Sequence, residues 1–333
     1  PPHAPTPRAG MGGATPTADD DLLQYEGREK WYVAPFAADD QPDWWAAELV
    51  SRDELVPGAV ALLTLDVEVS RERVPLRNAY MAAGQRASVR VVGGVEVELP
   101  VATPPPGPLA NHDALIAARN DQRSGDIKTV REPVTARARV GVWVEPKAAP
   151  GLWAAVPGDP LEVGPFRGTG PDLKPLAGAF AYPTVVVFAA GSGIATARAL
   201  LTAPPSASPL ALHLRKSVVV YYRAESASSL VWRDQFDAWA AEAAAGPGGA
   251  PRSGAPTSVR VVASSRDTFA DMFDDDDALE YDPAGTAALL LCGGDAEAAA
   301  EARAAAAAAE ITLVVDGDVD GDAVVHTDTA KVP

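Results

Sequence analysis

The chain has 333 residues and 47% of them are hydrophobic, which is enough for two domains with packed cores. Its 28 Lys and Arg residues against 45 Asp and Glu residues give a net charge of -17, which opposes binding to nucleic acids and to anionic membrane surfaces. No apolar run reaches the roughly 18 to 20 residues needed to cross a bilayer, so we expect no transmembrane segment. The single cysteine, Cys292, excludes an intramolecular disulfide, and the dispersed histidines lack metal-ligand spacing, so we expect no metal site.

The first part of the chain, residues 1–40, is expected to be a disordered or extended N-terminal tail. Residues 1–20 are rich in Pro, Ala, Gly and Thr and have no hydrophobic periodicity, so they cannot supply the apolar surface of a packed core. They also lack the apolar core of a secretory signal.

A first domain is expected over residues 41–178, where short apolar segments alternate or cluster and several end at Pro or Gly turns. This pattern is typical of strands in an antiparallel barrel. A polar segment of mixed charge, residues 109–132, interrupts the strands and predicts a surface insertion. The expected strands are residues 60–69, 86–92, 95–101, 136–145 and 160–166.

A second domain is expected over residues 179–333, where strands and helices alternate. Uninterrupted apolar strands separated by helices predict a parallel sheet covered on both faces, hence a doubly wound α/β domain. Asp295 is a plausible N-cap for the last helix, with Glu297 and Glu301 adding favourable charge in its early turns. The expected strands are residues 184–189, 217–222, 258–263 and 287–292, and the expected helices are residues 194–201, 227–246 and 295–310.

The turn Gly191-Ser192-Gly193 joins an apolar strand to a helix, which is the arrangement that holds a nucleotide pyrophosphate. Glycine allows the backbone to approach a ligand closely, and the N–H groups and dipole of the helix start favour phosphate. Ligands of parallel sheets bind at the carboxyl ends of the strands, where the turn after Cys292 is also expected. The sequence therefore predicts a nucleotide site at this edge.

Several motifs together resemble the ferredoxin-NADP reductase family, in that family's order, over residues 44–310. The amino-acid sequence of residues 182–201 and 218–239 most resembles a plant and algal branch of plastid-associated FAD/NAD(P)-binding oxidoreductase-like proteins. The motifs that carry the resemblance are Ala83-Gly84-Gln85, Pro157-Gly158-Asp159, Leu161 to Gly168, Gly191 to Ala195, Tyr221 to Phe236 and Cys292-Gly293-Gly294.

The resemblance implies a flavin-type barrel followed by an NAD(P)-binding domain, in an enzyme that moves electrons between NAD(P)H and an acceptor through FAD. It also implies a chloroplast location, with a dinucleotide and a protein acceptor or larger complex as partners. By this resemblance the nucleotide contacts are Gly191, Ser192, Gly193, Ile194, Thr196, Arg223, Arg233 and Gly293, with Cys292 near the nicotinamide, and the flavin contacts are Leu99, Thr103 and Gly151.

The expected flavin contacts depart from the family pattern. Where the family carries an Arg-x-Tyr-Ser motif, this chain reads Val97-Glu98-Leu99-Pro100, without the guanidinium, the ring or the hydroxyl. The stretch after Gly151 also lacks hydroxyls, while Trp143 or Trp153 either stacks on a cofactor or fills the barrel core. An alternative is therefore a non-catalytic reductase-fold subunit or scaffold of a larger plastid assembly, with weakened or lost flavin binding.

Other features leave alternatives open. Glu225 favours the free ribose of NADH. In contrast, several cationic or hydroxyl side chains could bind the 2′-phosphate of NADPH; these are Arg223, Ser226, Ser228, Ser229 and Arg233. Cys292 is either a nicotinamide contact or a small buried hydrophobe. The acidic turn that begins at Asp316 resembles a calcium loop but has Thr327 where a glutamate is needed, so we expect it to be solvated. The acidic run 274–277 is expected to cap a loop or stay solvated, with docking of a basic partner as the alternative.

Overall fold

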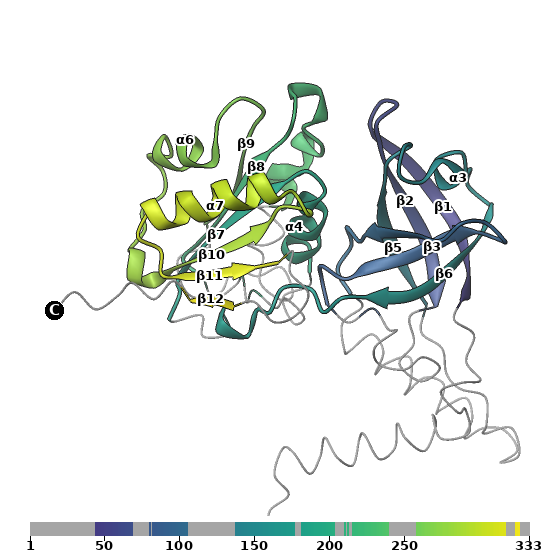
Figure 1. Ribbon diagram of the computed structural model, residues 1–333, viewed down its shortest axis with the longest axis horizontal. Helices are drawn as coiled ribbons and strands as arrows, with labels where there is room; N and C mark the ends of the chain where they lie inside the picture. Colours follow the sequence, from purple (N-terminus) through teal and green to yellow (C-terminus); the bar gives the residue numbers. More distant parts are fainter. Residues whose placement is uncertain are drawn as a thin grey trace, which may run out of the picture.

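The computed structural model forms two sheets, one on each side of residues 177–180 (Figure 1). The first sheet is formed by residues 45–167 and the second by residues 184–326. The structure describes residues 44–68, 80, 82–105, 137–176, 181–203, 210, 212, 215–239, 258–317 and 324–326. The expected tail, residues 1–40, and the expected insertion, residues 109–132, lie outside the described residues.

The barrel sheet has six strands in the order β4-β3-β6-β1-β2-β5, and all its pairs are antiparallel. Residues at the start of β1 alternate between buried and exposed, as expected for a sheet with one face on a core. The strands are β1 (Trp45–Val56), β2 (Val60–Glu68), β3 (Arg86–Val91), β4 (Val97–Pro100), β5 (Arg137–Val144) and β6 (Pro160–Arg167).

The two edge strands of this sheet meet at a seam, which closes the barrel. Val101, just after β4, forms an antiparallel bridge with Val142 of β5. Ala102 N donates to Gly141 O at 2.8 Å, and Gly141 N donates to the hydroxyl of Thr103 at 2.9 Å. Closure removes the free sheet edges, which would otherwise leave backbone groups unpaired. The expected antiparallel barrel is confirmed.

Two elements of the barrel were not expected from the sequence. Strand β1 is twelve residues long and contains register shifts at 49/51 and 54/56, where polar residues break the alternation. Helix α3 (Pro150–Trp153) has only four residues, too few to show a helical period.

The second sheet has the strand order β12-β11-β10-β7-β8-β9, and its first five strands in sequence are parallel. Strand β12 pairs antiparallel with β11 at one edge. The strands are β7 (Thr184–Ala190), β8 (Ser217–Arg223), β9 (Ser258–Ser264), β10 (Thr286–Leu291), β11 (Leu313–Asp316) and β12 (Val324–His326); the helices are α4 (Gly193–Leu201), α6 (Phe269–Asp274) and α7 (Ala296–Ala308), with 3-10 turns η3 (Lys174–Leu176), η5 (Ala227–Ser229), η6 (Arg233–Gln235) and η7 (Pro283–Gly285). The expected parallel sheet with helices on both faces is confirmed.

Alternate residues of β10 point to two different cores. Leu289 and Leu291 face α4, in a cluster that also contains Leu62 and Trp143 of the barrel. Leu290 and Cys292 face α6 and α7 on the other side. Figure 1 shows α4 on the side of the sheet that faces the barrel. One of these apolar clusters therefore spans both parts of the chain.

The helix expected over residues 227–246 is wrong over its first nine residues, 227–235, whereas residues 236–239 are helical as expected. Residues 227–235 form the turns η5 and η6, separated by Trp232, whose φ of 56° is left-handed. Such a conformation ends a helix, and packing of the Trp232 ring against the barrel favours it over local helix propensity. Conversely, the loop expected after β9 contains α6, which starts with a capping box between Thr268 and Asp271.

Asp316, which was expected to be solvated, is paired instead. Asp276, which was expected to cap a loop or stay solvated, accepts Ala278 N at 3.3 Å in its loop and is also paired with other side chains. The side chain of Asp316 is 2% exposed and forms an ion pair with Arg303 of α7. Asp276, in the acidic run after α6, accepts a hydrogen bond from the Tyr221 hydroxyl at 2.7 Å and an ion pair from Arg260. A buried carboxylate needs such partners, because an unpaired one is strongly destabilising. Within the described residues, no helix combines the length and apolar character needed to cross a membrane.

Candidate nucleotide-binding site

The glycine turn lies at the carboxyl end of β7, in the middle of the sheet. All seven residues of β7 are buried because helices cover both faces of this strand. Gly191 then turns the chain with a φ of 51°, and Ser192 is the N-cap of α4 without a capping bond from its own side chain. The helix has nine residues and begins at Gly193, so its first N–H groups point towards the turn.

The turn packs backbone to backbone against the loop that follows β10. A Cβ on Gly193 would lie 1.7 Å from the carbonyl oxygen of Leu291, and a Cβ on Gly293 would lie 2.5 Å from Ser192 Oγ. Both positions therefore require glycine. Gly293 and Gly294 also have positive φ angles, of 63° and 88°.

The opposite side of this pair of loops is open. A Cβ placed on Gly191 or on Gly294 would meet no atom within 4 Å. We call the turn Gly191-Ser192-Gly193 with Gly293 the glycine cradle. A pyrophosphate fits such a cradle, because exposed glycine backbone and a helix N-terminus together offer N–H donors and positive potential.

The next two predicted contacts position α4. Ile194 is fully buried in the core shared with the barrel. The Thr196 methyl carbon would lie 3.4 Å from a Cβ on Gly84, which places Thr196 beside the barrel turn before β3. These residues hold the helix in place behind the cradle.

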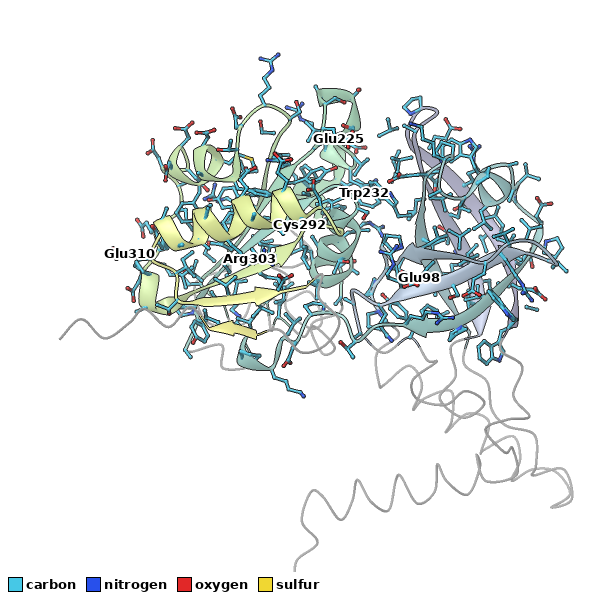
Figure 2. The ribbon with its side chains drawn as sticks, in the orientation of Figure 1. Glu98, Glu225, Trp232, Cys292, Arg303 and Glu310 are labelled. Atoms are coloured by element: carbon cyan, nitrogen blue, oxygen red, sulfur yellow. The ribbon has the colours of Figure 1, made fainter. Side chains whose placement is uncertain are left out.

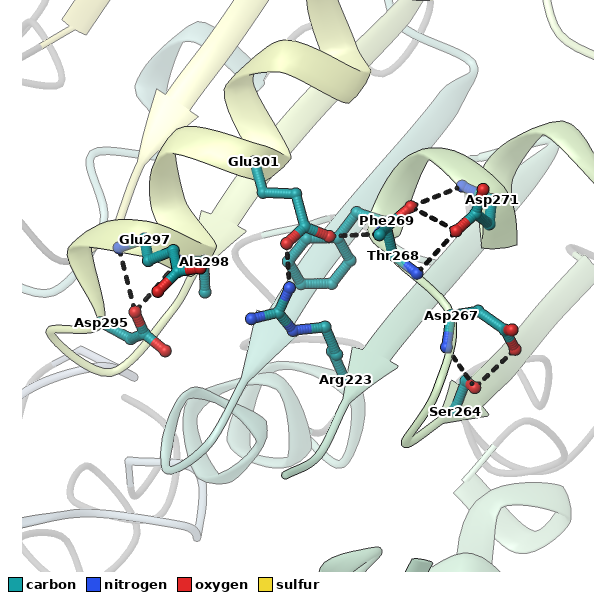
Figure 3. A network of polar contacts seen from close by, with 10 residues as sticks. All are labelled: Arg223, Ser264, Asp267, Thr268, Phe269, Asp271, Asp295, Glu297, Ala298 and Glu301. Atoms are coloured by element: carbon teal, nitrogen blue, oxygen red, sulfur yellow. Dashed lines mark hydrogen bonds and ion pairs between the residues drawn. The ribbon is translucent and has the colours of Figure 1, made fainter. Parts of the chain in front are cut away.

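Arg223, at the end of β8, is paired within the protein. Its guanidinium forms an ion pair with Glu301 of α7 and lies 5.7 Å from the centroid of the Phe269 ring (Figure 3). The other oxygen of Glu301 accepts a hydrogen bond from Phe269 N at 2.6 Å. Arg223 therefore joins β8 to α6 and α7, a role that sequence analysis did not foresee.

Other polar groups line the same carboxyl edge of the sheet. Arg233 and Glu225 are exposed, and so is Arg266 in the turn after β9, which the sequence analysis did not single out. The serines after β8 bond mainly to one another: Ser226 Oγ lies 2.9 Å from Ser229 Oγ. Arg233 and Arg266 are thus the exposed cations that the described part of this edge offers to an anionic ligand.

Cys292 follows β10, and its side chain is only 1% exposed. It packs in the apolar cluster beneath α6 and α7 (Figure 2). Its carbonyl oxygen accepts a hydrogen bond from Asp295 N at 3.0 Å. This position agrees with the small buried hydrophobe, the second of the two alternatives. A nicotinamide contact through Cys292 stays a prediction.

The predicted flavin contacts lie in different surroundings. Leu99 is 3% exposed and belongs to the barrel core. Thr103 accepts Gly141 N with its hydroxyl and the Tyr80 hydroxyl with its carbonyl, so it fastens the seam. Gly151 is exposed at the start of α3, where the atom nearest to an added Cβ would be Val91 Cγ2 at 3.9 Å. Of these three, Gly151 alone presents open backbone to a flavin phosphate.

The two tryptophans considered for stacking are engaged in protein contacts. Trp143 is buried and meets Trp232 edge to face, with ring centroids 5.8 Å apart. Trp153 lies beneath the guanidinium of Arg52, at 4.7 Å from the ring centroid. Figure 2 places Trp232 on the barrel-facing side of the second sheet.

No protein-family model and no curated protein matches this chain. Solved structures do match, and the first is a ferredoxin NADP+ reductase from Neisseria gonorrhoeae with bound FAD and NADP. It is 12% identical with a TM-score of 0.50, over 80% of this chain and 91% of that chain. A cytochrome P450 reductase of Amycolatopsis has 16% identity and a TM-score of 0.49, over 82% of this chain and 69% of that chain.

The CS-b5R domains of human Ncb5or in the NAD+ form have 13% identity and a TM-score of 0.49, over 82% of this chain and 69% of that chain. Identities this low establish the arrangement of the chain and not its activity. In this chain a closed antiparallel barrel precedes a parallel sheet with a glycine turn after its first strand. The chain therefore has the two-domain fold of the ferredoxin-NADP reductases.

Proposed function

We propose that this chain is an oxidoreductase of the ferredoxin-NADP reductase type that transfers electrons between NAD(P)H and an acceptor through FAD. The observation that carries the proposal is the glycine cradle, where Gly193 and Gly293 allow two loops to meet and Gly191 leaves one side open. The similar Neisseria reductase contains FAD and NADP, which supports the same pair of cofactors here.

Different residues of the chain would bind different parts of the two cofactors. The backbone of Gly191, Ser192 and Gly193 would hold the pyrophosphate, and Arg233 the adenosine end. Gly293 would let the nicotinamide approach the loop after β10. Gly151 would offer backbone to a flavin phosphate. The chemistry supplied by the bound cofactors is hydride transfer from a reduced nicotinamide to a flavin, followed by delivery of electrons to an acceptor.

The test is a visible absorption spectrum of the full chain purified with added FAD, followed by anaerobic mixing with NADH or NADPH. We expect a flavin spectrum that bleaches on mixing. Gly191→Ala should weaken nucleotide binding, because its Cβ would enter the open side of the cradle. Gly58→Ala is the matched control, since Gly58 also has positive φ and nothing within 4 Å of a Cβ, but lies in the β1–β2 turn. An equal loss of nucleotide affinity in both variants would contradict the assignment of the glycine cradle as the nucleotide site.

A second candidate is a non-catalytic reductase-fold subunit of a larger plastid assembly. It is favoured by Leu99, which fills the barrel core, and by Thr103, whose hydroxyl is used at the seam. A chain that takes up nucleotide but no flavin would support this candidate, whereas stoichiometric flavin with turnover would exclude it.

The partner and the location are further proposals. We infer a protein electron acceptor or a larger complex as the partner, and the net charge of -17 favours one with a basic surface. The chloroplast location rests on the resemblance of residues 182–201 and 218–239 to plastid-associated proteins. Fluorescence microscopy of a full-length fusion tests the location, and salt-dependent reduction of candidate acceptors tests the partner.

A further inference from the structure

Arg198 of α4 connects the helix of the glycine cradle to the barrel. It lies five residues after Gly193, and its Nη1 donates a hydrogen bond to the carbonyl oxygen of Ala102 at 2.7 Å. The rise of an α-helix is 1.5 Å per residue, so the Cα of Arg198 lies about 7.5 Å along the helix axis from the Cα of Gly193. The helix that begins at the cradle therefore also contacts the barrel.

Two tryptophan rings hold the Arg198 guanidinium in place. Its central carbon lies 5.3 Å from the centroid of the Trp232 ring and 6.0 Å from that of the Trp239 ring. Contacts of this kind between a cation and an aromatic ring contribute about 0.5–2 kcal/mol, more as water is excluded. Trp232 also meets Trp143 of β5 edge to face, so the ring that contacts Arg198 touches the barrel as well.

Arg198 contacts the barrel at a buried point beside the seam. Ala102 is fully buried, and its N–H donates to Gly141 O at 2.8 Å, next to the bridge between Val101 and Val142. Through Arg198, α4 therefore contacts the barrel at the seam where the sheet closes. The left-handed φ of Trp232 is a local cost that persists where surrounding contacts fix the residue.

We infer that Arg198 is a positioning residue that sets the distance and angle between the glycine cradle and the barrel seam. Its catalytic consequence rests on the proposed function: a dinucleotide on the cradle reaches a group bound in the barrel only while this geometry is kept. Lysine could keep a charge but not the planar fork that both stacks on Trp232 and donates to Ala102 O.

The experiment compares the full-length chain with Arg198→Gln and Arg198→Lys. The matched control is Arg303→Gln, which removes an arginine of α7 that pairs with Asp316, within the nucleotide-binding part of the chain. Hydrogen–deuterium exchange reports the geometry without any need for activity. We expect faster exchange in residues 101–103 and 141–143 in Arg198→Gln, a smaller change in Arg198→Lys, and none there in Arg303→Gln. Unchanged exchange in Arg198→Gln would overturn the inference.

Kinetics then separate positioning from nucleotide binding. In Arg198→Gln we expect the dissociation constant for nucleotide to change less than about threefold, while hydride transfer slows about 10- to 100-fold, because misplacement of about 1 Å costs that much. Arg198→Lys should recover part of the rate. Equal slowing in Arg303→Gln would reduce Arg198 to a general stabilising role. If the unaltered chain accepts no hydride from NADH or NADPH, the proposed function fails. The hydrogen–deuterium exchange measurement still decides whether Arg198 positions the cradle against the seam.

Discussion

Arg223 at the end of β8 pairs with Glu301 of α7, 78 positions later in the chain. Because Glu301 also accepts the N–H of Phe269, this glutamate ties β8, α6 and α7 together at the carboxyl edge of the sheet. The arginine that was predicted to contact the nucleotide is thereby held by the protein itself.

Replacement of Glu301 by Gln should lower the free energy of unfolding by about 1–2 kcal/mol, since it removes a half-buried ion pair but keeps an acceptor for Phe269 N. Urea denaturation measures the change. Glu297→Gln, an exposed position on the same helix, is the control and should cost under about 0.5 kcal/mol. A loss no larger than that of the control would show that the pair adds nothing to stability.

Gly193→Ala should disrupt the glycine cradle, because the new Cβ would lie 1.7 Å from Leu291 O and the backbone must move. We expect a loss of more than about 2 kcal/mol in stability, together with weaker nucleotide binding. Thermal unfolding and nucleotide titration measure these effects. Gly58→Ala, in the β1–β2 turn, is the control, since its Cβ would meet nothing within 4 Å. Native-like binding by Gly193→Ala would refute the close contact.

Asp276 should make stability depend on pH. Burial alone would raise the pKa of its carboxyl, but hydrogen bonds from Arg260 and Tyr221 outweigh burial, so the pKa is lowered on folding. A group with a lowered folded pKa stabilises fully above its unfolded pKa of about 3.9, and this contribution is lost as the pH falls through the folded pKa.

Asp276→Asn should therefore be less stable than the unaltered chain near neutral pH, and the two should converge as the pH falls below about 4. Urea midpoints over this range measure the difference, with the exposed Asp277→Asn as control. A stability gap that stays constant with pH would argue against the ionised carboxylate as its source.

Asp295→Ala should destabilise α7 by about 1 kcal/mol, because Asp295 Oδ1 accepts the N–H groups of both Glu297 and Ala298 at 3.0 Å. Asp295→Ser retains a side-chain acceptor and should recover most of this loss. The comparison is made by urea denaturation. Failure of serine to restore stability would assign the effect to charge at the helix start and not to the cap.

Much of the fold follows from local sequence. The uninterrupted apolar residues of β7 and the alternation in β5 gave strands within one or two residues of those observed, since burial on two faces or on one produces these patterns. The Asp295 cap was also predictable, because capping depends only on neighbouring residues.

The features that could not be predicted depend on contacts between residues that are far apart in the sequence. The left-handed Trp232 breaks a segment with helical propensity because its ring packs on Trp143, some ninety positions earlier. The partners of Arg223 and Asp316 likewise come from α7 and cannot be inferred from spacing. In the candidate site, the turn was predictable from its glycines, but the packing of Gly293 against Ser192 was not.

The barrel seam joins residues that are far apart in the chain. Val101 forms a bridge with Val142, and Gly141 N donates to the hydroxyl of Thr103, 38 positions earlier. The entropy lost on bringing such distant residues together must be offset before their contacts stabilise the barrel, so pairings of this kind form slowly. Closure of the barrel is therefore expected among the late steps of its folding.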